Sequence, residues 1–135
     1  MERFQKMNDR LILWLHDENV VDVEVLPQFA LCLTGDVCFW CTGSVSWLPW
    51  QQGGGTERRP LAELPSDVIA TMISSRPLSW AIFNTGEHCI VLSSRILLSV
   101  APGPADSWRL ALGDGTVLTH SPDSPWNGLA GQGRA

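Results

Sequence analysis

The chain has 135 residues, of which 44% are hydrophobic and 17% charged, and its 9 basic and 14 acidic side chains give a net charge of −5. This composition is typical of one globular domain, because a chain of this length can bury about two-thirds of the surface that it exposes when unfolded. An acidic surface repels phosphate backbones, and the pair Arg58-Arg59 is the main basic cluster. The charge therefore disfavours a nucleic-acid partner.

The apolar runs of the sequence are short. The longest, Leu11–Leu15 and Ala30–Leu33, fall far below the about 20 residues that a bilayer-spanning helix needs. The first residues include Glu2 and Asp9 and contain no apolar stretch before a cleavage site, which is not typical of a secretory signal. We therefore expect a cytoplasmic protein that does not enter a membrane and whose four cysteines are reduced.

Hydrophobic periodicity predicts the elements of the first half. Apolar residues at helical spacing, from Phe4 through Met7 to Leu15, predict an N-terminal helix. The period then changes to two, which predicts a strand over Val21–Val25 with Asp22 and Glu24 on a solvated face. Three more short strands follow, at Phe29–Leu33, Val37–Thr42 and Val45–Leu48, and the first two flank a turn at Thr34-Gly35-Asp36.

The second half begins with Gln51–Arg59, whose three consecutive glycines predict a flexible loop. A second helix is expected from Pro65 until Pro77 stops it. Four or five strands come next, at Leu78–Phe83, His88–Leu92, Ile96–Val100, Trp108–Leu112 and Thr116–His120. Pro, Ser, Gly and Asn dominate from Ser121 onward, which predicts a frayed tail over residues 121–135.

The order of these elements predicts an α+β fold. Residues 1–120 would form a single domain, mainly of antiparallel sheet with about eight or nine short strands, because the strands follow one another through short turns. The N-terminal helix and the one central helix would both cover the same face of this sheet. The sequence leaves the strand order and the oligomeric state open.

Cys38 and Cys41 have the spacing of a CxxC motif, but their expected setting argues against metal or redox chemistry. Three residues apart on a strand, the two side chains point to opposite faces, and the chelating geometry is lost. The same holds for His88 and Cys89, which are adjacent on a strand. We therefore expect neither a metal nor another cofactor, and interpret the cysteines as core residues.

The turn at Gly35-Asp36 suggests a further cysteine pair. With a two-residue loop Cys32 would lie opposite Phe39, which makes Cys32 and Cys41 diagonal neighbours on one face. These two residues would form a disulfide in an oxidising compartment, or remain buried thiols in the cytosol.

An enzyme is the alternative interpretation. A small hydrolase or thiol enzyme needs a cysteine nucleophile within hydrogen-bond reach of a histidine. The sequence offers candidates for this chemistry without a specific motif, namely Cys38, Cys41, His88, Cys89 and His120.

Tryptophan is abundant, with seven residues against no tyrosine. Alternation puts Trp40 on the opposite face from Phe39, so one of the two faces away from whatever covers the sheet, unless the sheet curls and buries both faces. Exposed tryptophan is enriched at binding hot spots. We therefore expect a partner-binding face on the side of the sheet opposite the helices, formed by Trp40, Trp47 and Trp50 with Asp22 and Glu24 at its rim.

These observations favour a non-catalytic domain that binds another protein. An acidic domain with an aromatic face suits a basic partner, since complementary charge speeds encounter. An immunity-type protein, an adaptor or chaperone-like protein, and a viral host-interaction protein all fit this description. Slow reaction of all four thiols would support the binding protein, whereas one fast thiol of low pKa would support the enzyme.

Overall fold

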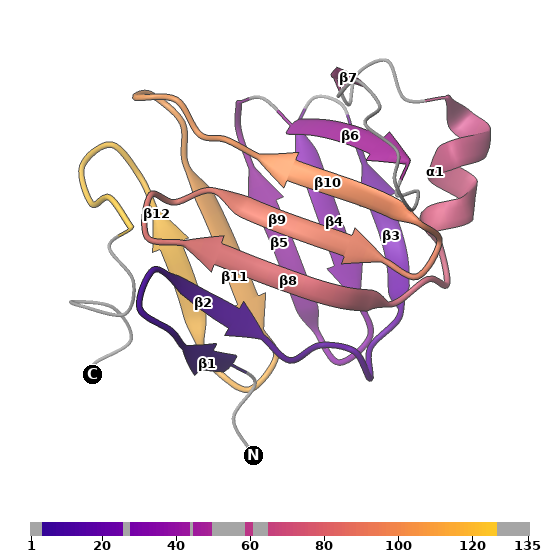
Figure 1. Ribbon diagram of the computed structural model, residues 1–135, viewed down its shortest axis with the longest axis horizontal. Coiled ribbons are helices and arrows are strands. Elements are labelled where there is room, and N and C mark those ends of the chain that lie inside the picture. Colours follow the sequence, from indigo (N-terminus) through magenta and orange to yellow (C-terminus); the bar gives the residue numbers. More distant parts are fainter. Residues whose placement is uncertain (1–3, 26–27, 44, 50–58, 61–64, 127–135) are drawn as a thin grey trace.

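Two antiparallel sheets stacked face to face make up the fold, as a computed structural model of the protein shows (Figure 1). The structure describes residues 4–25, 28–43, 45–49, 59–60 and 65–126. The expectation of mainly antiparallel sheet is confirmed, because every strand pair in both sheets is antiparallel. The stacking of two sheets was not predicted.

The first sheet has seven strands in the order β1-β2-β8-β9-β10-β6-β7 and is nearest the viewer in Figure 1. Chain segments far apart in sequence meet in it, since β2 pairs with β8 and β6 pairs with β10. Its strands are β1 (Phe4–Lys6), β2 (Arg10–Leu13), β6 (Val45–Pro49), β7 (Arg59–Pro60), β8 (Pro77–Phe83), β9 (His88–Leu92) and β10 (Ile96–Val100).

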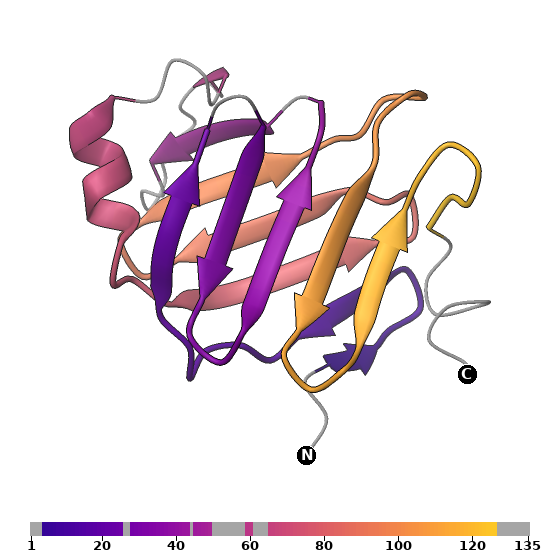
Figure 2. The ribbon, with the colours of Figure 1, turned by 180° about the vertical axis from the view of Figure 1, so that it is seen from behind.

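The second sheet has five strands in the order β12-β11-β5-β4-β3, and Figure 2 shows it from the other side of the molecule. It joins the hairpin β4–β5 to the late hairpin β11–β12 through the pair β5–β11. Its strands are β3 (Val20–Glu24), β4 (Phe29–Leu33), β5 (Val37–Cys41), β11 (Trp108–Leu112) and β12 (Val117–His120). The bounds of β4 and β11 are those that the sequence predicts, and the other three strands differ from the predicted ranges by one residue at one or both ends.

The expected N-terminal helix is wrong. Residues 4–13 form the hairpin β1–β2, with Phe4 opposite Leu13. Leu11, Leu13 and Leu15 are buried in alternation, whereas Met7 and Trp14, which a helical stripe would bury, are exposed. Pairing with β8 supplies the hydrogen bonds that the segment would otherwise make within a helix.

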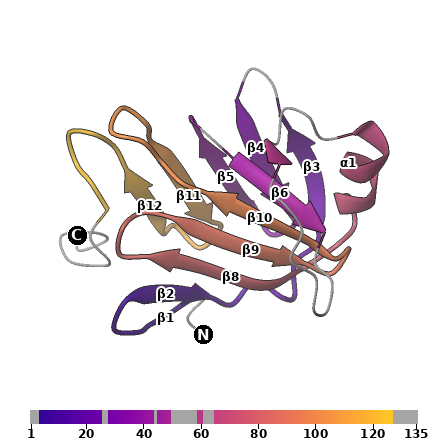
Figure 3. The ribbon, with the colours of Figure 1, turned by 45° about the horizontal axis from the view of Figure 1, so that its top comes forward.

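The central helix is confirmed as α1 (Ser66–Met72), which begins after Pro65 and ends before Pro77. Met72 is fully buried and Val68 and Ile69 pack against the core. The helix lies at one end of the sandwich beside β3 (Figure 3). The expectation that helices cover a sheet face is therefore wrong: each sheet covers the inner face of the other, which buries the same apolar surface.

The core continues beyond the expected domain boundary at His120. Trp126 is buried, and its ring lies 5.4 Å from that of Trp108. The packed part of the chain therefore extends to Trp126, while residues 127–135 lie outside the described residues. Gln51–Arg59, the expected loop, also falls outside them except for Arg59. In the part of the chain that the structure describes, no helix has the length and apolar character to cross a bilayer.

Candidate functional site: the outer face of the five-stranded sheet

Five strands turn one face outward, away from the other sheet, and the register aligns its side chains in two rows. One row runs from Thr119 through Arg109, Trp40 and Ala30 to Glu24. The other contains Val117, Ala111, Cys38, Cys32 and Asp22 in the same strand order. We call these ten residues the Trp40 face.

A disulfide joins Cys32 to Cys38 in the middle of this face. The two residues lie directly opposite each other because the hairpin loop has three residues, with Leu33 opposite Val37. The expected pairing of Cys32 with Phe39 is therefore wrong by one residue, and so is the expected neighbour Cys41. Gly35 and Asp36 both adopt positive φ, which lets this longer loop close.

Trp40 is the large side chain of the face and is half-buried. Arg109 lies opposite it on β11, and the guanidinium carbon is 5.2 Å from the centre of the indole ring. Such a contact is a cation–π interaction, which restrains the two side chains relative to each other. In its row Trp40 thus lies between Arg109 on β11 and Ala30 on β4.

Asp22 and Glu24 lie at the β3 end of the two rows, where the sheet has its edge. Both side chains are exposed, which confirms the expected solvated face of this strand. Their carboxylates lie on the same side of the sheet as Trp40, since Glu24 pairs with Ala30 and Ala30 pairs with Trp40. The structure therefore brings together three of the residues that the sequence suggested.

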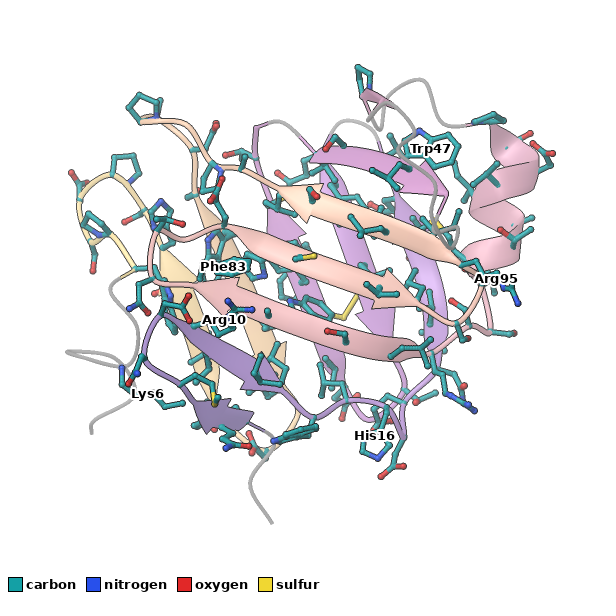
Figure 4. All side chains as sticks on the ribbon, viewed as in Figure 1. Lys6, Arg10, His16, Trp47, Phe83 and Arg95 are labelled. Carbon is teal, nitrogen blue, oxygen red and sulfur yellow. A yellow bond between two sulfur atoms is a disulfide. The ribbon has the colours of Figure 1, made fainter. Side chains whose placement is uncertain are left out.

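Trp47 does not belong to this face. It is 5% exposed and lies on β6 of the other sheet, on the side of the molecule that carries α1 (Figure 4). Its neighbour on β10 is Leu98, another core residue. The expectation that Trp47 and Trp40 share an exposed face is wrong because the two strands belong to different sheets. Trp50 lies outside the described residues.

The inner side of the same sheet is an aromatic cluster. Phe39 contacts the rings of Trp80, His88 and Trp108 at centroid distances of 5.6, 4.6 and 6.2 Å. Because side chains alternate along β5, Phe39 lies in the core and its neighbour Trp40 lies on the outer face. The cluster fixes the strands that carry the Trp40 face.

The residues of the alternative, a thiol enzyme, do not come together. Cys38 is held in the disulfide, and Cys41 points to the opposite face, as the alternation predicted. Burial, with a smaller contribution from Asp106, raises the pKa of the Cys41 thiol to about 12. A thiol protonated in this way is a poor nucleophile at neutral pH.

Both histidines that the thiol enzyme would use, His88 and His120, make packing and hydrogen-bond contacts in or beside the core. His88 is 2% exposed and points inward, whereas the half-buried Cys89 beside it lies on the outer face of the seven-stranded sheet. His120 Nδ1 accepts a 2.8 Å hydrogen bond from the backbone N–H of Trp126, and burial lowers its pKa. Within the described ranges, no three His, Cys, Asp or Glu side chains form a group that could hold a metal.

Two features of the Trp40 face were not predicted from the sequence. Arg109 alternates with the buried Trp108 and Leu110, so its outward direction was readable, but its place beside Trp40 depends on the long-range pair β5–β11. The disulfide had a signal, since Cys32 and Cys38 are equally far from Gly35. A three-residue loop pairs residues at that spacing.

No family model matches the chain, and comparison with curated proteins and with solved structures gives no match. The interpretation of the site therefore rests on its geometry and chemistry.

Proposed function

We propose that the protein is a non-catalytic domain that binds another protein through the Trp40 face. The observation that carries this proposal is the register row in which a half-buried tryptophan lies between Arg109 and the acidic edge strand. Tryptophan and arginine are the residue types most often found as interface anchors, and a packed tryptophan loses little conformational entropy on binding.

The composition of the face supports a protein partner. Ala30, Ala111, Val117 and the disulfide lie on the same face as Trp40 and are small or medium-sized apolar groups. Interfaces combine such an apolar centre with a polar rim. Asp22 and Glu24 supply that rim on one side.

The charge of the rim defines the partner. Two exposed carboxylates at the β3 edge favour lysine or arginine at the facing position, and the chain as a whole has a net charge of −5. A partner with a basic patch beside an apolar contact fits this pattern, because opposite charges accelerate encounter and fix orientation. No cofactor takes part in this proposal.

The test uses the tagged full-length protein as bait in an extract of the cells that express it. The captured proteins are identified by mass spectrometry, purified and titrated against wild type and Trp40→Ala. We expect Trp40→Ala to weaken binding by about 30-fold, which corresponds to about 2 kcal/mol for an anchor residue. Met7→Ala, which truncates an exposed apolar side chain in the β1–β2 turn, should bind as wild type does.

The acidic rim has its own test. Replacing both carboxylates by amides, Asp22→Asn with Glu24→Gln, should slow association and reduce its salt dependence with little change in dissociation. Partners that bind folded Trp40→Ala with unchanged affinity would overturn the proposal.

The cytoplasmic location stays a prediction. The Cys32–Cys38 disulfide weighs against it, since disulfides persist in oxidising compartments and are rare in the cytosol. Thiol trapping in intact cells decides the matter: a reduced pair supports the cytoplasm and an oxidised pair contradicts it.

A further inference from the structure

The segment that follows β12, residues 121–126, folds back onto the strand that it leaves, and Figure 1 shows it as the yellow loop after β12. It turns between Ser121 and Ser124, whose backbone N–H and C=O groups bond to each other at 3.2 and 3.1 Å. The turn returns the chain to His120, whose Nδ1 accepts the 2.8 Å hydrogen bond from the backbone N–H of Trp126. We call residues 121–126 the Trp126 strap.

The strap covers the ring of Trp108 at one end of the core. Trp126 is 3% exposed and packs against Trp108, which is itself 3% exposed. The ring of His120 stacks on Trp108 as well, at a centroid distance of 6.0 Å with 12° between the planes. The indole N–H of Trp126 is buried without a hydrogen-bond partner in the described structure. The strap is therefore held by the acceptor on His120 and by the packing of its own indole ring.

That acceptor is an imidazole nitrogen, which accepts a hydrogen bond only while the ring is neutral. An imidazolium carries a proton on both nitrogens and offers no acceptor in either ring orientation. Protonated His120 would face the Trp126 N–H with another donor and leave that N–H without an acceptor, which is unfavourable for a buried group. We propose that the Trp126 strap is a pH-sensitive latch, closed while His120 is neutral and released when His120 binds a proton.

The direction of the pH dependence follows from the state of the ring before and after release. Burial lowers the pKa of His120 while the strap is closed. Release exposes the ring to solvent, which returns its pKa to about 6.5. Above this pH the ring is neutral in both states and the strap stays closed. Below it the released state binds a proton more readily than the closed state, so opening becomes easier as the pH falls.

His120 is the group that titrates in this part of the core. Burial and, to a smaller extent, His120 hold the pKa of His88 at about 3, so His88 stays neutral between pH 7.5 and pH 5. The charged side chains on the elements around His120 are Glu87 in the β8–β9 turn, Asp106 before β11, Arg109 on β11 and Asp123 in the strap. Burial lowers the pKa of His120 without a contribution from these four groups.

Hydrogen exchange of single amides, followed by NMR on the full chain, measures the release of the strap. The exchange rate of the Trp126 N–H, divided by the rate of an unstructured peptide at the same pH, gives its opening constant. From pH 7.5 to pH 5 we expect this constant to rise by up to about 30-fold, the most that protonation of a released ring of pKa 6.5 provides. It should exceed the opening constant of Leu110, which pairs with strands on both sides and reports unfolding of the sheet.

Three variants test the role of the histidine. His120→Asn keeps an acceptor one bond beyond Cγ and removes the titration, so the opening constant of Trp126 should be the same at both pH values. His120→Leu removes the acceptor and should raise the constant at pH 7.5 about tenfold. His16→Asn makes the first of these changes at an exposed histidine and should keep the rise of wild type.

The proposal does not depend on the proposed function, because it concerns the inner side of β12 and the strap. Three results would overturn it. The first is a Trp126 opening constant that does not change with pH in wild type, and the second is an equal rise in His120→Asn. The third is the same opening constant for Trp126 and Leu110, which would show that the strap opens only when the sheet unfolds.

Discussion

Trp80 and His88 are diagonal neighbours on the inner face of the β8–β9 pair, and Trp80 Nε1 donates a 2.9 Å hydrogen bond to His88 Nδ1. Since Nδ1 accepts, neutral His88 carries its proton on Nε2, an atom that is buried without a hydrogen-bond partner in the described structure. His88 also lies 4.3 Å from Trp108, centre to centre, in a T-shaped contact. The hydrogen bond thus lies within the seven-stranded sheet, and the ring contact of His88 with Trp108 on β11 links it to the five-stranded sheet.

The Trp80–His88 hydrogen bond should show as a coupling between the two residues. Trp80→Phe removes the donor and leaves Nδ1 buried and unpaired, while His88→Phe removes the acceptor. In a double-mutant cycle measured by urea unfolding, we expect a coupling free energy of about 1–2 kcal/mol. Additive losses in the two single variants would show that the contact contributes nothing to stability.

The stability of the protein should fall in mild acid because of His88. Burial, with a smaller contribution from His120, lowers the pKa of His88 to about 3 in the folded protein, whereas an unfolded histidine has a pKa of about 6.5. Above pH 6.5 both states are neutral and the stability is fully present. Below it the unfolded state binds a proton that the folded state excludes until about pH 3, so the free energy of unfolding falls as the pH falls.

At pH 5 this loss amounts to roughly 2 kcal/mol relative to pH 7.5. Urea unfolding at both pH values measures it, and the shallower pH dependence of His88→Phe serves as the control. Equal slopes for wild type and His88→Phe between pH 7.5 and pH 5 would contradict the assignment.

The disulfide should contribute to stability through the unfolded state. Linking Cys32 to Cys38 closes a loop of sequence separation 6, for which the loss of chain entropy predicts about 2 kcal/mol. We expect the free energy of unfolding to fall by this amount when reductant is added. The variant with Cys32→Ser and Cys38→Ser should show the lower stability with and without reductant.

Thiol counting gives an independent check of the same bond. The unreduced protein in denaturant should react with two equivalents of a thiol reagent, from Cys41 and Cys89, and with four equivalents after reduction. Four equivalents without reduction would show that the bond is absent.

The N-terminal hairpin makes opposite predictions for two adjacent residues. Leu13 is buried on the inner face and Trp14 is exposed, so Leu13→Ala should cost about 2–5 kcal/mol of folding free energy. Trp14→Ala should leave the unfolding of the monomer within about 0.5 kcal/mol of wild type. A helix with the apolar stripe Phe4, Met7, Leu11, Trp14 and Leu15 requires the reverse order, so chemical unfolding of the two variants distinguishes the structures.

The error at the N-terminus shows what a single sequence leaves open. Leu11 and Leu15 fit both a helical stripe and, with Leu13, a strand of period two. The partner that decides between them is β8, whose residues Ala81–Phe83 lie about 70 positions further along the chain. By contrast, β4, β5 and α1 were placed correctly because their turns and prolines are local signals.

In the candidate site too, local features were predicted correctly and features that depend on long-range strand pairing were not. The opposite directions of Phe39 and Trp40, and of Cys38 and Cys41, follow from alternation alone and are confirmed. The separation of Trp40 from Trp47 depends on which sheet each strand joins, and β6 pairs with β10 about 50 residues away. The register of the hairpin depends on one residue of loop length, which the sequence Thr34-Gly35-Asp36 permits in either form.

Site-specific photo-crosslinking tests the central claim, that the Trp40 face binds a partner protein, most directly. A benzophenone side chain is placed at Val117 on the Trp40 face in one variant and at Ser79, on the outer side of the seven-stranded sheet, in a control variant, and both are irradiated in the cells that express the protein. We expect an adduct of the chain with a different protein from the Val117 probe and no such adduct from the Ser79 probe. Capture of the different protein by the Ser79 probe alone, or by neither probe, would contradict the claim.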